Sequence, residues 1–372
     1  MDKDANRLDQ LDGLRGLAAL SVFLFHTIEL VAREPNARDM SSWNVLRPFW
    51  DGSAAVYLFF VLSGFVLALP YAGSSGRKID PLPFVIRRIA RLYPAYWVAI
   101  LLSLGLRFMV FSPPGLFGLS PWINSLWHLP ITLGSLLRHL LLIAPNLNTD
   151  QIDPVIWSLV AEMKVSLVFP AVLVLIQQTK KPWFALVALG LAIFCDAYFH
   201  IFGHLAIFLF GAYVAKYRGA ITGLLGASIW LRIGLGICGY CLYGAASFFP
   251  PLRDPYLEIT IAIGGCIFIV LFLYDGILKK VGRWEPVRFL GDVSYSFYLT
   301  HLPILLTVAS LLYPRTNSIW LCMAVSLACS LGLSYAIFRL IEMPAHNWGR
   351  RQGKAIGRLI AGSVAVEQGV AP

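Results

Sequence analysis

Apolar stretches long enough to cross a bilayer recur from one end of this chain to the other. A helix of about 20 apolar residues spans a hydrocarbon core roughly 30 Å thick. Only 13% of the 372 residues are charged and 58% are hydrophobic, whereas a soluble domain carries roughly 25% charged residues. The sequence therefore predicts an all-α, polytopic integral membrane protein.

Ten membrane spans are expected near residues 14–33, 52–71, 93–111, 154–177, 183–201, 203–216, 229–248, 256–274, 289–312 and 319–342. One connection is long, 112–153, and its apolar stretch 136–144 is too short to span, so it lies in the interface or folds back. We expect a transmembrane domain over 14–345 between a cytoplasmic N-terminal segment, 1–13, and a cytoplasmic C-terminal tail, 346–372. The first apolar run lacks a cleavage site of the A-x-A kind and is expected to stay as a helix.

Basic residues test this topology. The segments expected on the side of the N-terminus hold 20 Lys and Arg, and those on the other side hold six. Cytoplasmic segments carry the excess of basic residues, so both ends are expected in the cytoplasm. The net charge of +10 then reflects topology, and no nucleic-acid partner is expected. The six cysteines lie in apolar segments, where cysteine packs as a small hydrophobe, and no metal site is expected.

Ionisable residues inside spans are costly and so mark candidate functional sites. Arg15 begins the first span and His26 follows eleven residues later. At about 100° per residue the two side chains face nearly the same way, about 16 Å apart along the helix axis. A lone histidine on an apolar helix is often structural. Because an arginine is aligned with it, a functional role for His26 is about as well supported as a structural one.

Other candidate residues lie on the third, fourth, ninth and tenth predicted spans or beside them. Glu162 is about two turns inside the fourth span and needs a partner on another helix, either in a structural ion pair or beside an imidazole. Arg88 and Arg91 share one helical face at the cytoplasmic surface, which suits phosphate but also suits a positive-inside loop. Tyr295, Tyr298 and His301 follow at intervals of three residues, and their polar groups could hydrogen-bond neighbouring helices. Glu342, before Met343 and Pro344, is interpreted as an interfacial helix end.

Six segments together resemble the membrane acyltransferases of the acyltransferase-3 type. In chain order they read LDGLRGLAALSVFLFH, VYLFFVLSGFVLA, RRIARLYPAYW, IWSLVAEMKVSLVFP, SYSFYLTHLPI and IEMP. The resemblance covers residues 11–344, nearly the whole chain. It implies a bacterial, multi-pass protein of the inner membrane that moves acetyl or other acyl groups onto hydroxyls of glycans or smaller acceptors. The last motif has Met343 where the family commonly has a basic residue.

The resemblance also implies roles for these residues. Arg15 and His26 match the family's arginine–histidine motif, Arg88 and Arg91 its basic element, and Glu162 its acidic position in the fourth span. We expect His26 to be the catalytic base or a transient acyl carrier, with Glu162 and Arg15 assisting, and the phosphates of acyl-coenzyme A to bind Arg88, Arg91 and Arg15. Support for the substrate or the structure is expected from Asp12, Ser63, Tyr295, Tyr298 and His301.

The expected reaction is therefore O-acylation with acyl-coenzyme A, acetyl being the expected acyl group. The sequence leaves the acceptor open, and separate glycan-assembly proteins are potential partners besides membrane lipids. A polytopic transporter or exporter of a lipid-linked glycan or acyl group is the competing interpretation. Transporters often show interrupted spans in matching positions of two halves, which this sequence lacks, and dependence on coenzyme A separates the two.

Overall fold

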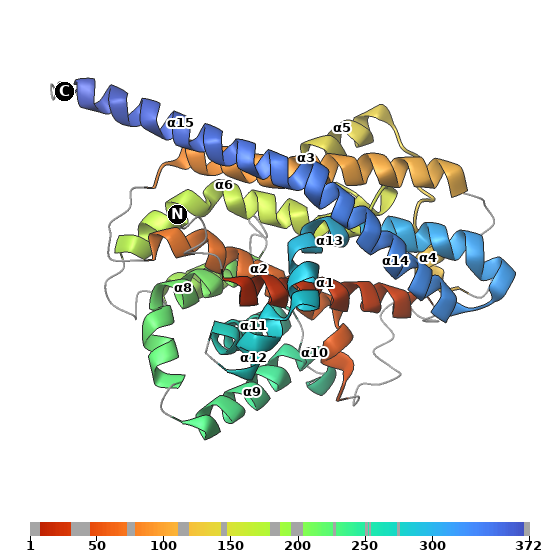
Figure 1. The fold of residues 1–372 in the computed structure, drawn as a ribbon, viewed down its shortest axis with the longest axis horizontal. Helices are drawn as coiled ribbons and strands as arrows, with labels where there is room; N and C mark the ends of the chain where they lie inside the picture. The colour runs from red at the N-terminus through yellow and green to blue at the C-terminus, as the bar shows by residue number, and fades with distance from the viewer. Residues whose placement is uncertain are drawn as a thin grey trace.

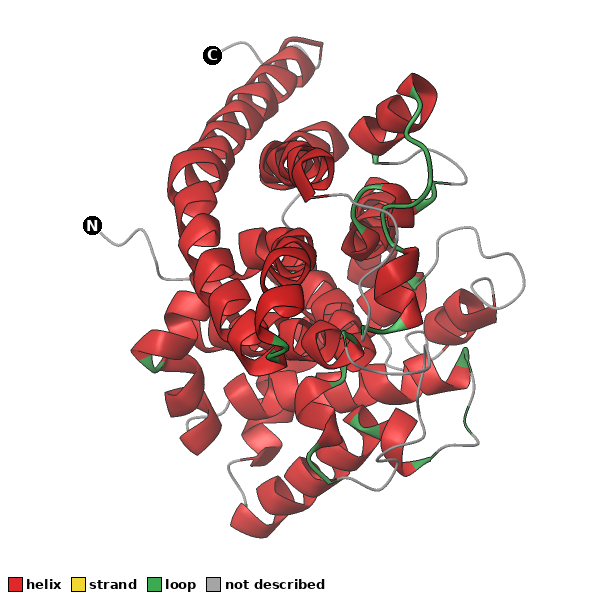
Figure 2. Ribbon diagram, turned by 90° about the vertical axis from the view of Figure 1, so that its right-hand side faces the viewer, coloured by secondary structure: helices red, strands yellow, loops and turns green. Residues whose placement is uncertain are grey.

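The structure, a computed structural model, describes residues 8–30, 45–72, 79–110, 119–142, 147–178, 187–194, 204–225, 228–249, 252, 254–273 and 276–367. Regular structure in these ranges is helical, without strands (Figure 2). The helices are α1 (Asp9–Glu29), α2 (Gly52–Ala68), α3 (Pro81–Val110), α4 (Pro121–Ser125), α5 (Leu133–Leu141), α6 (Trp157–Gln178), α8 (Leu205–Leu225), α9 (Ile229–Tyr243), α10 (Ala245–Phe248), α11 (Tyr256–Leu273), α12 (Ile277–Arg283), α13 (Glu285–Thr316), α14 (Ile319–Ile337) and α15 (Met343–Glu367). Residues 187–194 are also helical.

Seven helical segments of the described ranges are long and apolar enough to cross a membrane. They are Asp9–Glu29, Gly52–Tyr71, Pro81–Val110, Pro154–Gln178, Tyr256–Leu273, Glu285–Thr316 and Ile319–Leu359. The chain is thus an all-α protein with several membrane-crossing helices, as predicted. Predicted span 203–216 falls on the 21-residue α8, and 229–248 on the 15-residue α9 and the short α10. Predicted span 183–201 lies outside the described residues except for 187–194, and the count of ten stays a prediction.

Helix α3 begins twelve residues earlier than the predicted third span, at Pro81 instead of residue 93. The basic segment that was expected to lie between spans is therefore part of this helix. The reason is tertiary: Arg88 and Arg91 each pair with a carboxylate from another helical segment. A paired guanidinium can be packed inside a bundle where an unpaired one could not.

Helices α1 and α13 run parallel and in close contact. A Cβ atom on Gly16 of α1 would collide with the backbone of Leu290 and Gly291 in α13. Further along, the rings of Phe23 and Phe297 lie 5.8 Å apart, centroid to centroid. Small residues allow membrane helices to approach this closely. The glycines of the LDGLRG motif thereby set the register in which the later parts of both helices face each other.

Helices α2 and α8 cross at another pair of glycines. A Cβ atom on Gly64 would collide with the carbonyl group of Phe208, and one on Gly211 with the backbone of Val61 and Phe65. Helix α2 itself is capped by Asp51, whose carboxylate accepts a hydrogen bond from the Ala54 backbone N–H at 2.9 Å. The SGF motif of the second span is therefore a helix-packing site.

The long connection folds back against the bundle through α4 and α5. Thr132 and Ser135 form a capping box at the start of α5. The Trp97 indole N–H and the Tyr93 hydroxyl of α3 donate to the carbonyls of Leu140 and Leu141. The predicted stretch 136–144 is thus partly helical and packed on α3, while residues 143–146 lie outside the described ranges. This fold-back brings α4 next to the end of α1.

The C-terminal helices form one continuous rod with a π-helical turn at Phe338–Glu342 between α14 and α15. Figure 1 shows α15 (blue) running along α3 (orange) and projecting past the other helices. Gly349 and Gly353 let α15 approach Ala90 and Arg87 of α3. The interpretation of Glu342 as an interfacial helix end is wrong: the helix continues, and the residue is 1% exposed. The predicted domain boundary at 345 stays a prediction.

Candidate active site

His26 lies near the C-terminal end of α1 and is held between rings from two other helices. Its Nδ1 is 2.9 Å from Nε2 of His301 in α13. Its ring also stacks on Trp122 of α4, with 5.6 Å between centroids and 13° between planes. His301 is completely buried. The parallel packing of α1 and α13 thus produces a histidine pair, His26 and His301, which the spacing along the chain could not reveal.

A cavity of about 280 Å³ lies beside the histidine pair. It is lined by His26, by residues at the start of α2 and α6, and by the returning connection. The polar and aromatic side chains among its lining residues include Ser53, Trp122, Thr149, Asp150, Trp157 and Tyr298. Aromatic surfaces with a few convergent polar groups are typical of small-molecule and substrate sites. An imidazole is therefore presented to a cavity with room for a ligand group.

Tyr298 forms part of the cavity wall and ties α13 to the start of α6. Its hydroxyl oxygen lies 2.8 Å from the Ser158 hydroxyl and donates to the Val155 carbonyl at 3.0 Å. The predicted supporting role of Tyr298 is compatible with this position. Trp157, the neighbour of Ser158, is 40% exposed and faces the same cavity.

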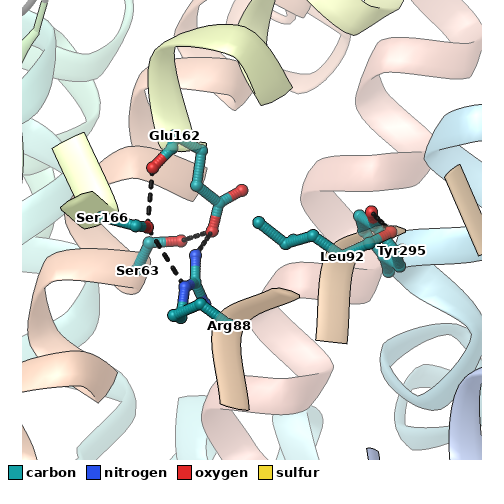
Figure 3. Close-up of polar contacts among 6 residues, drawn as sticks. All are labelled: Ser63, Arg88, Leu92, Glu162, Ser166 and Tyr295. Atoms are coloured by element: carbon teal, nitrogen blue, oxygen red, sulfur yellow. Dashed lines mark hydrogen bonds and ion pairs between the residues drawn. The ribbon is translucent and has the colours of Figure 1, made fainter. Parts of the chain in front are cut away.

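The second predicted group of residues lies around Arg88 (Figure 3). The Arg88 guanidinium forms an ion pair with Glu162, and its Nε–H donates to the Ser166 hydroxyl at 3.1 Å. The Ser63 hydroxyl donates to the same Glu162 oxygen at 3.1 Å. The Arg88 and Glu162 side chains are only 13% and 18% exposed. This network joins α2, α3 and α6 at the positions that the sequence singled out.

Arg91 makes the corresponding connection to the end of the chain. Its guanidinium pairs with Glu342, which also accepts a hydrogen bond from Ser296 at 2.8 Å. The Tyr295 ring lies 5.5 Å from the Arg91 guanidinium carbon, a cation–π distance. The Tyr295 hydroxyl donates to the Leu92 carbonyl at 2.7 Å (Figure 3). An arginine of α3 is thus paired with the carboxylate of the π-helical turn.

Arg15 belongs to the same assembly. It lies 3.8 Å from the Asp12 carboxylate one turn earlier on α1, and it interacts electrostatically with Arg88, Arg91 and Glu162. We call Arg15, Arg88 and Arg91 with their carboxylate partners Asp12, Glu162 and Glu342 the arginine cluster. Three guanidiniums and three carboxylates are thereby brought together from α1, α3, α6 and the π-helical turn.

Known sequences place the chain in a family. The acyltransferase-3 family model, described as an acyltransferase domain, matches residues 8–339. The chain belongs to the acyltransferase-3 family.

Individual relatives agree with this assignment. The chain is 25% identical over 376 residues to BcsY of Komagataeibacter xylinus, named as a membrane-bound transacylase, covering 93% of this chain and 85% of BcsY. It is 24% identical to the O-acetyltransferase OatA of Staphylococcus aureus, covering 93% of this chain but 60% of OatA. It is 28% identical over 268 residues to the exopolysaccharide production protein ExoZ of Rhizobium meliloti, covering 68% of this chain and 76% of ExoZ. No solved structure matches significantly. The protein is therefore an enzyme, an acyltransferase similar to OatA.

One predicted contact of this acyltransferase is wrong. Glu162 was expected either in an ion pair with another helix or beside the His26 imidazole; its carboxylate pairs with Arg88 and accepts a hydrogen bond from Ser63, so the contact with the imidazole is the wrong alternative. The partner of the imidazole is His301 instead. Arg88 and Arg91, expected as a phosphate site, each carry a carboxylate partner already. The predicted site residues thus lie in or beside two groups, the arginine cluster with Ser63 and Tyr295, and the histidine pair with Tyr298.

Three features of the acyltransferase were misread or not predicted from the sequence. Glu342 was seen but taken for a helix end, because a π-helical turn has no sequence signal of its own. Trp122 lies in a connection without helical periodicity. A further polar cluster joins Tyr57, His204 and Glu258: the Tyr57 hydroxyl donates to Glu258 at 2.8 Å, and His204 Nδ1 lies 3.2 Å from its other oxygen.

In the described ranges no group of three or more His, Cys, Asp or Glu could hold a metal ion; independence of metals stays a prediction.

Proposed function

We propose that the enzyme transfers an acyl group, acetyl being the expected one, from acyl-coenzyme A to a hydroxyl of a glycan or glycolipid. The observation that carries the proposal is His26, an imidazole presented to a cavity in a chain of the acyltransferase-3 family. Imidazole is the side chain best suited to accept and return a proton near neutral pH.

The chemistry needs one proton relay. The acceptor's hydroxyl oxygen bonds to the thioester carbonyl carbon while the carbon–sulfur bond breaks. The hydroxyl proton passes to His26 and then to the leaving thiolate, which gives an ester and free coenzyme A. If His26 is a transient carrier, its ring nitrogen bonds to the same carbon first while the carbon–sulfur bond breaks and coenzyme A leaves as the thiolate. The hydroxyl oxygen then bonds to that carbon, the carbon–nitrogen bond breaks, and the hydroxyl proton passes through the freed ring nitrogen to the thiolate. Both routes use the same side chain in the same cavity.

The arginine cluster is the proposed site for the donor's phosphates. A guanidinium has five N–H donors, and Arg88 uses one nitrogen for Glu162 and another for Ser166. Phosphate oxygens can therefore bind remaining N–H groups of Arg15, Arg88 and Arg91 without breaking the ion pairs. No metal takes part in this proposal.

The orientation in the membrane follows from the charge bias. With ten spans and both termini in the cytoplasm of a bacterial inner membrane, the start of α1 is at the cytoplasmic face, where coenzyme A is available. His26, about 16 Å further along the axis, then lies a little past the middle of a hydrocarbon core roughly 30 Å thick. The name of ExoZ, an exopolysaccharide production protein, supports a polysaccharide as acceptor, and that of OatA supports transfer of an acetyl group to oxygen. Membrane lipids and separate glycan-assembly proteins are proposed neighbours, and no nucleic-acid partner is.

The competing function is a transporter or exporter of a lipid-linked glycan or acyl group. The experiment that separates the two measures thiol release from acetyl-, succinyl- and longer acyl-coenzyme A by the purified protein in liposomes. Continuous release of coenzyme A with at least one donor is the expected result. Absence of release with every donor, from protein shown to be folded by a cooperative melting transition, would favour the transporter.

A further inference from the structure

The hydrogen bonds of His301 determine which of its ring nitrogens carries the proton. Its Nδ1 lies 2.7 Å from the Tyr298 carbonyl oxygen and 3.2 Å from that of Phe297. A carbonyl oxygen can only accept a hydrogen bond, so Nδ1 must be the N–H. In a neutral imidazole the other nitrogen then bears the lone pair, and Nε2 of His301 is an acceptor.

This assignment fixes the tautomer of His26 as well. The acceptor Nε2 of His301 is 2.9 Å from Nδ1 of His26, so a hydrogen bond between them requires Nδ1 of His26 to be the donor. The lone pair of His26 is then on Nε2. The ring that carries this nitrogen lines the cavity and is held flat against Trp122.

The electrostatic surroundings favour two neutral rings. Among the described residues, the contacts of both histidines are with each other, with backbone carbonyls of α1 and α13 and with aromatic rings, and neither is bonded to a carboxylate. Two imidazolium ions at 2.9 Å would repel each other, and burial adds a desolvation cost to each. The neutral pair with one donor and one acceptor in contact is the arrangement that satisfies every one of these groups.

We propose that His301 is a positioning residue for His26. This inference rests on the proposed acyl transfer and extends its mechanism to a second histidine. His301 holds the His26 ring and keeps the Nε2 lone pair toward the cavity, ready to take a proton or attack an acyl carbon. When Nε2 takes the acceptor's proton, the positive ring keeps its Nδ1–H bond to His301, which stabilises the charge. In hydrolases a carboxylate orients the catalytic histidine in this way; here a neutral imidazole does so.

The first test compares His301→Gln with His301→Leu in acetyl-coenzyme A turnover. The glutamine amide can still accept from His26 and donate to a carbonyl, whereas leucine can do neither. We expect His301→Leu to lower kcat by at least about 10-fold, a part of the roughly 10²–10⁴-fold that a positioned acid–base group contributes, with KM for the donor changed less than about twofold. His301→Gln should recover most of the loss. The matched control is Thr300→Val, a buried residue one position away on α13.

The second test reads the tautomer itself, by chemical rescue of His26→Gly. Imidazole has both an N–H and a lone pair, whereas 1-methylimidazole lacks the N–H. We expect imidazole to restore turnover and 1-methylimidazole to restore about tenfold less, again a part of the roughly 10²–10⁴-fold contribution of a positioned acid–base group. In the double variant His26→Gly/His301→Leu the two compounds should act equally, because nothing remains to accept the N–H.

The outcomes separate this inference from the proposed function. His26-dependent turnover combined with unchanged kcat in His301→Leu, or equal rescue by both compounds when His301 is present, overturns the positioning role and leaves the acyltransferase mechanism intact. Wild-type protein without turnover of any acyl-coenzyme A overturns both. A folding failure of His301→Leu, seen as loss of its melting transition, leaves the rescue of the single His26→Gly variant as the deciding result.

Discussion

Single buried carboxylates are the residues that tie the distant parts of the sequence together. Glu162 and Glu342 each take an arginine of α3 and a hydroxyl from another helix. Removing one partner of a buried ion pair leaves an uncompensated charge, which costs about 3–5 kcal/mol. These carboxylates therefore belong to the stability of the bundle even if the guanidiniums also bind the donor.

The Arg88–Glu162 pair can be tested by a double-mutant cycle. Arg88→Gln and Glu162→Gln are each expected to lower the melting temperature in detergent clearly, because each leaves the opposite charge buried. The double variant should be more stable than the sum of the two single effects predicts, by about 1 kcal/mol or more. Strictly additive effects would show that the ion pair has no energetic role.

Asp153 provides a pH-dependent prediction at the same scale. It directly precedes the fourth predicted span and is completely buried. Burial raises the pKa of its carboxyl well above the usual range. Its contribution to stability is therefore fully present below the unfolded-state pKa of about 3.9 and is lost as pH rises through the folded-state value. Asp153→Asn keeps the acceptor for the Val155 backbone N–H and should remove this loss. Melting temperatures that fall equally with pH in both proteins would contradict the prediction.

Pairs of helices in this fold are set by glycines at their crossings. Gly16 and Gly64 both lie in motifs quoted from the sequence, and the structure explains them as points of backbone contact. Because these contacts involve backbone atoms of the partner helix, a methyl group can be accommodated only if the helices move apart. The length of the apolar stretches predicted the helices but could not predict which of them would touch.

Gly64→Ala tests the crossing of α2 and α8. Forcing extra volume into a packed contact costs typically about 1–3 kcal/mol, so a lower melting temperature is expected. Gly105→Ala is the matched control, since a Cβ atom there has no neighbour within 4 Å and alanine is the better helix former. Equal stability of the two variants would mean that the α2–α8 contact can relax freely.

The sequence predicted many residues of the candidate site but few of the contacts between them. Arg15 and His26 could be aligned on one helix because their spacing is local, and the segments around Arg88, Glu162 and His301 were quoted in the right order. The pairings of Glu162, Glu342 and His301 could not be derived, since each depends on how two distant helices pack. Trp122 was missed because its position is set by a fold-back that has no repeating pattern.

The whole molecule separates charge from imidazole along α1. The arginine cluster gathers around the start of that helix and the histidine pair near its end. If the charge bias sets the orientation, the proposed donor site lies near the cytoplasm and the histidine pair lies deeper in the membrane. Reporter fusions test this topology: a fusion at Asn317, between α13 and α14, should report the outer side, and one at Gly276 the cytoplasm. The reverse pattern would invert the proposed orientation.

The most direct test of the account is the rate of coenzyme A release from acetyl-coenzyme A by wild-type protein and His26→Ala, in liposomes and at matched folded concentration. We expect the variant to be slower by about 10²–10⁴-fold, the usual contribution of a positioned acid–base group, with an unchanged melting temperature. A folded His26→Ala protein that releases coenzyme A at the wild-type rate would contradict the assignment of the chemistry to His26.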